Sequence, residues 1–319
     1  MHCEADSLDD LLYEVFERLL EVEANVNPTK GKNSEIFGAL LTLNNPKARL
    51  SITESKGKAF SALGELLWYL SGSSKLEPIQ FYIPKYKDFS DDGINIHGAY
   101  GPRLIKMGGK VNQITRIIDL LQNKPNTRRA VIQLFHYTDL NENFKDIPCT
   151  TTLQFVNRDQ KLHCMVSMRS NDAYLGLQHD IFCFTMIQEI IAKELGLSLG
   201  TYIHSVGSLH LYEKNKNNAK EYLQEGRQST KFAMKGMTSS PLDNFDKLLR
   251  LEQSIRLNLK IDEKEINLPT YWYDLFLMLK IHFILKNNLN LTEEIMNQIS
   301  DRTLKHYASE KNRKQKYTA

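Results

Sequence analysis

Hydrophobic and polar positions alternate between two periods along the chain, and this pattern predicts an α+β domain. Apolar residues at three- and four-residue spacing predict helices over 8–22, 57–72, 112–122 and "HDIFCFTMIQEIIAKEL", which ends before Gly196. Runs with strand character predict strands at 35–43, "RRAVIQLFHY" and 201–210, and a hairpin of "TTLQFVN" and "KLHCMVSM" around "RDQ". A further helix is expected from 211. The aromatic-rich stretch from Gly72 to Gly101 is expected to be irregular.

The pattern changes near Gly226, after which the segments are mainly helical. We therefore expect a main α+β domain, a helical C-terminal extension and a basic, disordered tail, over 1–225, 226–307 and 308–319. The most apolar late segment, 271–286, carries Asp274 and Lys280 and is too short to span a bilayer. The N-terminus lacks the basic region and apolar core of a secretion signal. These features together predict a soluble, cytoplasmic protein.

Composition and charge narrow the function classes. The chain has 319 residues, of which 41% are hydrophobic, so it can bury a sizeable core. Its 41 Lys and Arg stand against 38 Asp and Glu, a small excess that predicts neither a nucleic-acid partner nor a membrane partner. Four cysteines without paired spacing favour reduced thiols in a reducing compartment. Nine scattered histidines without a ligand spacing predict no metal site.

Candidate chemistry begins with Cys149 in "DIPCTTTLQF", directly after a proline and at the mouth of a predicted strand. A thiol there is either packed or a nucleophile, and a nucleophile needs nearby cations or backbone donors. Arg169 and Ser170 in "MRSND" could hold a phosphate, or could lie at a solvated strand end. Arg128 and Arg129 in "NTRRA" point to opposite faces if a strand begins there, and surface arginines often serve solubility alone.

Six sequence blocks together resemble the thymidylate synthase superfamily over roughly residues 8 to 215. They are "GELLWYLSG", "HGAYG", "TRRAVIQLF", "PCTTTLQFV", "MRSNDAYLGL" and "HSVGSLHLY", in this order. The resemblance implies a mixed sheet flanked by helices. It also implies a pyrimidine nucleoside monophosphate as substrate, 5,10-methylenetetrahydrofolate as co-substrate, and a homodimer.

The resemblance also implies roles for individual residues. Cys149 would attack C6 of the pyrimidine, and Glu65 would run the proton and water network. Residues that would hold the substrate are Arg169, Ser170, His210, Tyr212, Thr150, Gln154 and Tyr100, with Arg128 and Arg129 reaching the phosphate from the partner subunit. Residues that would meet the folate are Asp172, Gly176 and Trp68.

Two departures from the synthase pattern bear on the substrate. Thr150 follows Cys149 where synthases have histidine, and Asp180 in "LGLQHDIF" stands where synthases have a base-reading asparagine. Uracil offers an N3–H donor and an O4 acceptor, which an amide satisfies. Cytosine offers its N4 amine, and N3 takes up a proton once a thiolate adds at C6, so both groups suit a carboxylate. Asp180 could also be an N-cap for the helix that follows, and both roles could hold at once, but the pairing with cytosine is the preferred interpretation.

The combination of Thr150 and Asp180 is similar to the deoxycytidylate and cytidylate hydroxymethylase branch. In that branch water, rather than hydride from the folate, quenches an exocyclic methylene at C5, and Glu65 would order the water. A divergent thymidylate synthase making dTMP from dUMP is the alternative, and a catalytically silent nucleotide-binding or nucleic-acid-binding descendant is a third possibility.

Three further departures concern the folate, the C-terminus and the phosphate. The chain runs on through helical segments, without the short apolar ending with which synthases close over the folate. "FYIPKYKDFSDDG" lacks the tryptophan of the corresponding synthase segment, and Tyr86 could replace it. "PTKGKNSE" offers Lys30 and Lys32 in place of a phosphate-binding arginine.

Overall fold

The computed structural model describes residues 1–24, 26–28, 31–53, 57–141, 143–227, 232–238, 241–262 and 266–318. Within these residues, six strands form one mixed sheet in the order β1-β2-β6-β5-β4-β3. The strands are β1 (His2–Ala5), β2 (Asn33–Leu43), β3 (Val131–Gln133), β4 (Thr150–Arg158), β5 (Lys161–Asp172) and β6 (Ser198–Tyr212). β5 and β6 run parallel, as do β1 and β2, and the other neighbours are antiparallel. The predicted α+β class with a mixed sheet is confirmed.

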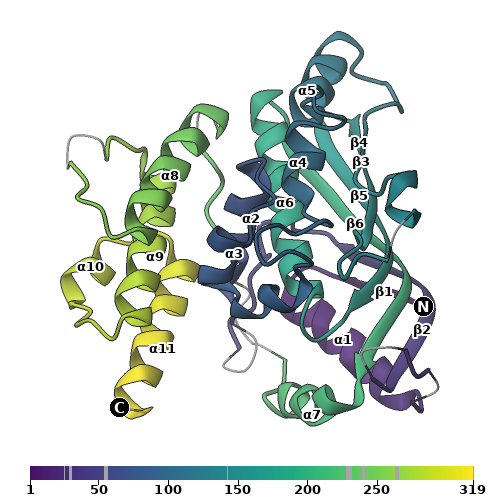
Figure 1. Cartoon of the computed structure of the whole chain (residues 1–319), viewed down its shortest axis with the longest axis horizontal. Coiled ribbons are helices and arrows are strands. Elements are labelled where there is room, and N and C mark those ends of the chain that lie inside the picture. Colours follow the sequence, from purple (N-terminus) through teal and green to yellow (C-terminus); the bar gives the residue numbers. More distant parts are fainter. Residues whose placement is uncertain are drawn as a thin grey trace.

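Helices cover the sheet, with α6 (Leu177–Glu194) packed directly on β5 and β6 (Figure 1). Nearly all of α6 is buried, which its apolar residues on every face allow. The remaining helices of this part are α1 (Leu8–Glu21), α2 (Ala59–Leu70), α3 (Leu76–Tyr82), α4 (Tyr100–Ile105), α5 (Gln113–Asn123) and α7 (Lys216–Gln224). Short 3₁₀ turns are η1 (Pro84–Phe89), η2 (Tyr137–Leu140) and η3 (Glu213–Asn215).

The C-terminal part forms a helical group beside α2, α3 and α6 (Figure 1). It consists of α8 (Pro241–Arg256), α9 (Thr270–Lys286), α10 (Glu293–Asn297) and α11 (Arg302–Thr318). α9 packs on α2, where the rings of His282 and Phe60 lie 5.2 Å apart, and on α8, where the buried Trp272 meets Phe245 edge-on. α8 also packs on α6. Buried Arg49 pairs with Glu189 of α6, which also accepts the Met237 N–H at 2.9 Å. These contacts join the helical part to the sheet domain.

The C-terminal tail differs from the sequence expectation. Disorder was expected from residue 308, but α11 continues through Thr318. Ala308 is fully buried, and Gln315 Nε2 donates to the Leu285 carbonyl of α9 at 3.0 Å. Most residues of this segment are polar or basic, so its few inward-facing positions do not stand out in the sequence. These positions give α11 a surface that packs against the other helices.

The remaining differences concern short elements. The stretch from 73 to 100 contains α3 and η1 because Leu76, Ile79 and Tyr82 recur on one buried face, a pattern too short to stand out in sequence. Strand β1 was not predicted. The strand expected from Arg128 onward pairs only over Val131–Gln133. β6 extends to Tyr212, so the helix expected from 211 starts later, in α7.

Close packing at Gly64 of α2 predicts a large loss of stability on substitution. A Cβ at Gly64 would lie 2.1 Å from the ring of Tyr82, whose hydroxyl donates to Glu252 of α8 at 2.9 Å. Gly64→Ala is therefore expected to lower the free energy of unfolding by about 1–3 kcal/mol or more. Gly236→Ala is the control, since its Cβ would meet only Glu189 Oε1 at 3.7 Å. Denaturant unfolding of both variants measures this, and equal midpoints would contradict it.

Candidate active site

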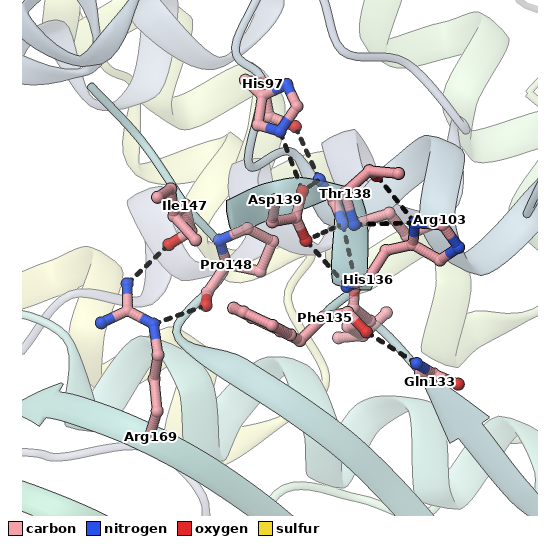
Figure 2. A network of polar contacts seen from close by, with 11 residues as sticks. His97, Arg103, Gln133, Phe135, His136, Thr138, Asp139, Ile147, Pro148 and Arg169 are labelled. Atoms are coloured by element: carbon pink, nitrogen blue, oxygen red, sulfur yellow. Dashed lines mark hydrogen bonds and ion pairs between the residues drawn. The ribbon is translucent and has the colours of Figure 1, made fainter. Parts of the chain in front are cut away.

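Cys149 lies where the chain enters β4, and the neighbouring strand fixes its backbone. Its carbonyl accepts the Arg169 N–H of β5 at 2.8 Å, and its side chain is half-buried. The guanidinium of Arg169 reaches back to the same loop, with Nε donating to the Pro148 carbonyl at 3.0 Å and Nη2 to the Ile147 carbonyl at 2.9 Å (Figure 2). None of the four cysteines, which all lie in described segments, forms a disulfide. Cys149 is thus a thiol on a firmly held loop beside an arginine.

An ion-pair network supports the preceding η2 turn (Figure 2). Buried Asp139 accepts both terminal nitrogens of Arg103, at 2.8 and 2.7 Å, and His97 Nε2 lies 2.9 Å from its Oδ1. The His136 N–H donates to the same carboxylate at 2.7 Å. Burial opposes the charge, but these hydrogen bonds outweigh it and lower the pKa of Asp139. The "HGAYG" block therefore helps to hold the segment that leads to Cys149.

Thr150 and Tyr100 lie together beside the thiol. The Thr150 N–H and hydroxyl both donate to the Tyr100 hydroxyl oxygen, at 3.1 and 2.9 Å. Burial raises the pKa of Tyr100 well above its ordinary value, and the charges of Asp180 and Cys149 raise it further. Tyr100 is therefore a neutral phenol that is bonded to Thr150 and near enough to both Cys149 and Asp180 for their charges to affect it.

Glu65 of α2 is buried beneath two phenols. The hydroxyls of Tyr69 and Tyr86 both donate to its Oε1, with the Tyr69 bond at 3.0 Å. Burial raises the pKa of Glu65, while these two hydrogen bonds oppose the rise. Trp68 packs edge-on against Tyr86 with ring centroids 5.3 Å apart, and its indole N–H donates to the Lys75 carbonyl at 3.0 Å. Trp68 thus supports Tyr86, which faces Glu65.

Asp180 lies in the first turn of α6. Burial raises its pKa well above the ordinary value, the Glu65 charge raises it further, and a hydrogen bond from Asn171 lowers it. A Cβ at Gly176 would lie 3.0 Å from Asn171 Oδ1 and 3.5 Å from Asp180 Oδ2, so these side chains meet above that glycine. Gly176 is thus a close-packing position next to Asp180, whatever it contributes to folate binding.

The remaining predicted residues divide into two groups. Asp172, His210 and Tyr212 lie at the adjacent ends of β5 and β6, with Asp172 opposite His210, and Ser170 lies two residues earlier on β5. Asp172 Oδ1 accepts the N–H groups of Tyr174 and Leu175, at 2.9 and 3.0 Å, which fixes its turn. Burial raises the pKa of Tyr212, and the charges of Asp172 and Cys149 add to this rise. Tyr212 is therefore near enough to Cys149 for its charge to act on the phenol, and the other three residues lie on the same two strands.

The second group lies elsewhere on the same chain. Gln154 Nε2 donates to the Arg128 carbonyl at 3.1 Å, and Gln154 is opposite Val131 in the β4–β3 pair. Five residues of strand separate Gln154 from Cys149, or roughly 16 Å. Arg128 and Arg129 are exposed there. Within one chain, Gln154 and the two arginines are therefore not brought to the thiol.

Sequence reasoning missed three contributors, and it could have found one of them. Tyr69 follows Glu65 by four residues on α2, a spacing that places both on one helix face. Asn171 sits within the quoted "MRSND" block, but its contact with α6 depends on the fold. No local sequence pattern indicates that Asp139 contributes to the site. Lys30 lies outside the described residues, while Lys32 pairs with Glu213 at 3.6 Å on the surface.

The segments that the structure describes contain neither a cluster for a metal ion nor a helix suited to a membrane. Among these residues, no group of three or more His, Cys, Asp or Glu side chains is placed to hold a metal ion. No helix that they form combines the length and apolar character needed to cross a bilayer.

A strand-end thiol, a nearby arginine and two carboxyl groups of raised pKa together form a candidate site for covalent chemistry on an anionic substrate. Comparison with known proteins identifies the family. The family model described as thymidylate synthase matches residues 9–252, which is more than half of the chain and extends into α8. The chain belongs to the thymidylate synthase family, as the six sequence blocks predicted.

Two relatives illustrate the range of the family. A deoxyuridylate hydroxymethyltransferase of Delftia phage PhiW-14 is 31% identical over 195 residues, covering 57% of this chain and 54% of the relative. A thymidylate synthase of Buchnera aphidicola subsp. Baizongia pistaciae (strain Bp) is 29% identical over 193 residues, covering 59% of this chain and 73% of the relative. The chain therefore spans about half the length of the phage relative. Members of this family transfer a one-carbon unit from 5,10-methylenetetrahydrofolate to a pyrimidine nucleotide.

Proposed function

We propose that the protein 5-hydroxymethylates a cytidine nucleotide, CMP or dCMP, with 5,10-methylenetetrahydrofolate as co-substrate. The observation that carries this proposal is Asp180, a titratable carboxyl at the position where synthases have an amide. The phage relative, named for hydroxymethyl transfer to deoxyuridylate, supports the water-quench chemistry in this family.

The first step assigned to the chain is addition of the Cys149 thiolate to C6 of the base. This forms an S–C6 bond, turns C5 into a nucleophile and pushes electron density toward N3. Asp180 then gives its proton to N3 and becomes a carboxylate. The raised pKa of Asp180 supports this role, because a carboxyl that is neutral before the attack can act as the acid.

The protonation state of Asp180 determines which hydrogen-bond donors and acceptors it offers to the base. A neutral carboxylic acid donates to N3 of cytosine and accepts from its N4 amine. After the transfer, N3 and the N4 amine are both donors, and the Asp180 carboxylate has only acceptors. This is the pairing of cytosine with a carboxylate that the sequence predicts. Cytosine is thus matched before and after the attack.

The folate would supply the one-carbon unit that becomes attached to C5, and it would leave as tetrahydrofolate once the C5 proton is lost, so that the base carries an exocyclic methylene. The residues present fit its heterocycle: Tyr86 offers an aromatic ring supported by Trp68, and Asp172 offers a carboxylate to ring N–H donors. Gly176 lies at the end of the same turn as Asp172. We therefore assign these four residues to the folate side of the pocket.

Glu65 is assigned to the final water step. With Tyr69 and Tyr86 both bonded to Oε1, the other carboxyl oxygen is the one assigned to hold the water that attacks the exocyclic methylene of the base. The water adds its oxygen to that carbon and gives up one proton, so the product carries a CH₂OH group at C5. Loss of the Cys149 bond to C6 then restores the aromatic ring and the thiolate, and the N3 proton returns to Asp180.

Phosphate binding is assigned to Arg169 and Ser170, with Arg128 and Arg129 of a second copy. The position of the two arginines, exposed and distant from Cys149 along the sheet, supports an action in trans. The sheet face away from α6 is partly apolar, since Val131 and Met165 are 41% and 36% exposed. We propose that a second copy covers this face in a homodimer.

Complementation of two inactive variants tests the shared site. Cys149→Ser removes the nucleophile, and Arg128→Ala with Arg129→Ala removes the donated arginines. Mixed dimers then hold one complete site, so an equal mixture is expected to recover about one quarter of wild-type activity after exchange of subunits. Steady-state rates of the mixture and of each variant alone measure this. No recovery, with mixed dimers demonstrated, would place the arginines outside the site.

A second candidate is a divergent thymidylate synthase that makes dTMP from dUMP. It is favoured by the same raised pKa, because a protonated Asp180 offers uracil the donor and acceptor that asparagine would. Release of tritium from 5-tritiated CMP, dCMP and dUMP in parallel decides between the candidates. We expect release from a cytidine nucleotide, and release from dUMP alone would overturn the cytidine assignment.

A further inference from the structure

Tyr82, at the end of α3, connects the helical C-terminal part to the sheet domain, and no catalytic step described above uses it. Its hydroxyl donates to Glu252 of α8 at 2.9 Å, and its ring stacks on His282 of α9 with ring centroids 5.2 Å apart. Tyr82 and Glu252 are 8% and 6% exposed. Burial raises the pKa of Tyr82 well above its ordinary value, so the phenol keeps the proton that it donates. Breaking this bond would leave a buried donor without a partner, so the ring has one preferred position.

Other contacts from α8 and α9 hold the same end of α3. Arg256 Nε donates to Glu252 at 2.8 Å, and Arg256 Nη1 pairs with Glu77 of α3. Lys286 of α9 donates to the Phe81 carbonyl, and its Nζ lies 4.3 Å from the centre of the Phe81 ring. The end of α3 is therefore fixed to two helices of the C-terminal part.

The ring of Tyr82 also lies directly against the backbone of α2. A Cβ built on Gly64 would lie 2.1 Å from Cγ of Tyr82, so only a glycine lets the ring approach this closely. The contact is made at the residue immediately before Glu65. The main-chain position of Glu65 therefore depends on where the Tyr82 ring lies.

Tyr82 is close in sequence to η1, the turn that carries Tyr86. The Ile83 N–H donates to the Ile79 carbonyl at 2.8 Å, and the Tyr86 N–H donates to the Ile83 carbonyl at 3.1 Å. These main-chain bonds fix the short connection from Tyr82 to Tyr86, whose hydroxyl donates to Glu65 Oε1. Both partners of that hydrogen bond are thus held through Tyr82, one by way of α2 and the other by way of η1.

We propose that Tyr82 is a positioning residue for the Glu65 and Tyr86 pair, and that the helical C-terminal part acts on catalysis through it. This inference rests on the proposed assignment of Glu65 to the water step. Water attacks the exocyclic methylene efficiently only when the Glu65 oxygen that holds it is correctly placed, and small displacements of such a group lower the rate strongly.

Tyr82→Phe separates this role from a purely structural one. The variant keeps the aromatic ring but loses the bond to Glu252, so the ring is no longer anchored to α8. The attack of water is expected to slow, whereas addition of the Cys149 thiolate and loss of the C5 proton come earlier and keep their rates. The base with its exocyclic methylene then accumulates, still joined to Cys149 through C6. Product formation within one turnover is expected to lag behind tritium release by roughly tenfold.

The experiment is a rapid-quench single turnover of the full chain, with enzyme in excess over a 5-tritiated cytidine nucleotide. Tritium release and hydroxymethylated product are measured at the same times. Tyr222→Phe is the matched control, because it removes another buried bond from a tyrosine to a carboxylate, at 2.9 Å to Asp9 of α1. Both variants are expected to lose stability in denaturant, but only Tyr82→Phe is expected to show the lag. An equal ratio of the two rates in the wild type and Tyr82→Phe, or an equal lag in both variants, would overturn the inference.

Two substitutions of Glu252 test the same bond from its other end. Glu252→Gln keeps an oxygen that can accept from Tyr82, so its ratio of rates is expected to stay near that of the wild type. Glu252→Leu has no acceptor and is expected to show the lag of Tyr82→Phe. An equal lag in both Glu252 variants would assign the effect to the lost charge opposite Arg256 and would overturn the role of Tyr82.

The same data separate this inference from the proposed function. A wild type that hydroxymethylates a cytidine nucleotide, with no lag in Tyr82→Phe, overturns the inference alone. A wild type that only makes dTMP from dUMP overturns the proposed function, and the inference falls with the water step. If Glu252→Leu does not fold, Tyr82→Phe with its control still decides the question.

Discussion

Cys149→Ser is expected to abolish nucleotide turnover, with kcat falling on the order of 10⁴-fold or more. An alcohol in place of the thiol cannot form the S–C6 adduct, so release of the C5 proton has no route. Tritium release from a 5-tritiated nucleotide measures this loss. The backbone bond between the Cys149 carbonyl and Arg169 is unaffected, so folding and phosphate binding are expected to remain.

Cys3→Ser is the matched control for this change. It makes the same atomic replacement in β1, at the far edge of the sheet order from β4. Full activity of Cys149→Ser, with a wild-type circular dichroism spectrum, would exclude covalent catalysis and favour a catalytically silent nucleotide-binding protein.

Asp180→Asn is expected to reverse the base preference. An amide cannot give N3 of cytosine a proton, so kcat/KM for the cytidine nucleotide is expected to fall by roughly 10²-fold or more. The value for dUMP, whose donor and acceptor an amide matches, is expected to stay at least as high as in the wild type. Parallel kinetics with the three nucleotides measure both effects.

Asp243→Asn controls for the loss of an acidic residue in the first turn of a helix. Asp243 is exposed in the first turn of α8, so an N-terminal charge is removed there as well. A cytidine-to-uridine ratio in Asp180→Asn equal to that of the wild type would show that Asp180 serves only the helix.

The sequence predicts the central residues of the site because they belong to local blocks at element ends. Cys149 at the start of β4, Arg169 near the end of β5 and Asp180 in the first turn of α6 lie in three such blocks. In this fold, strand ends and helix starts lie close together. The position of these three residues at such ends therefore predicts that they lie near one another.

Contacts between segments that are far apart in the sequence cannot be predicted from local sequence patterns. Tyr86 reaches Glu65 from a 3₁₀ turn, and Asn171 bonds His204 across two parallel strands. The charge state of Asp180 depends on burial and on Glu65, which no local pattern reports. The sequence therefore suggests a carboxylate at this position, whereas burial raises the pKa of Asp180 and favours the neutral carboxyl that the proposed mechanism uses.

The most direct test of the proposed function is the mass of the product formed from CMP and dCMP with methylenetetrahydrofolate in heavy-oxygen water. Addition of a hydroxymethyl group that carries the heavy oxygen to either nucleotide is the predicted result. It would establish the cytidine substrate, its sugar and the water quench together. A methyl group without heavy oxygen on the product, or no cytidine product beside dTMP formed from dUMP, would contradict the account.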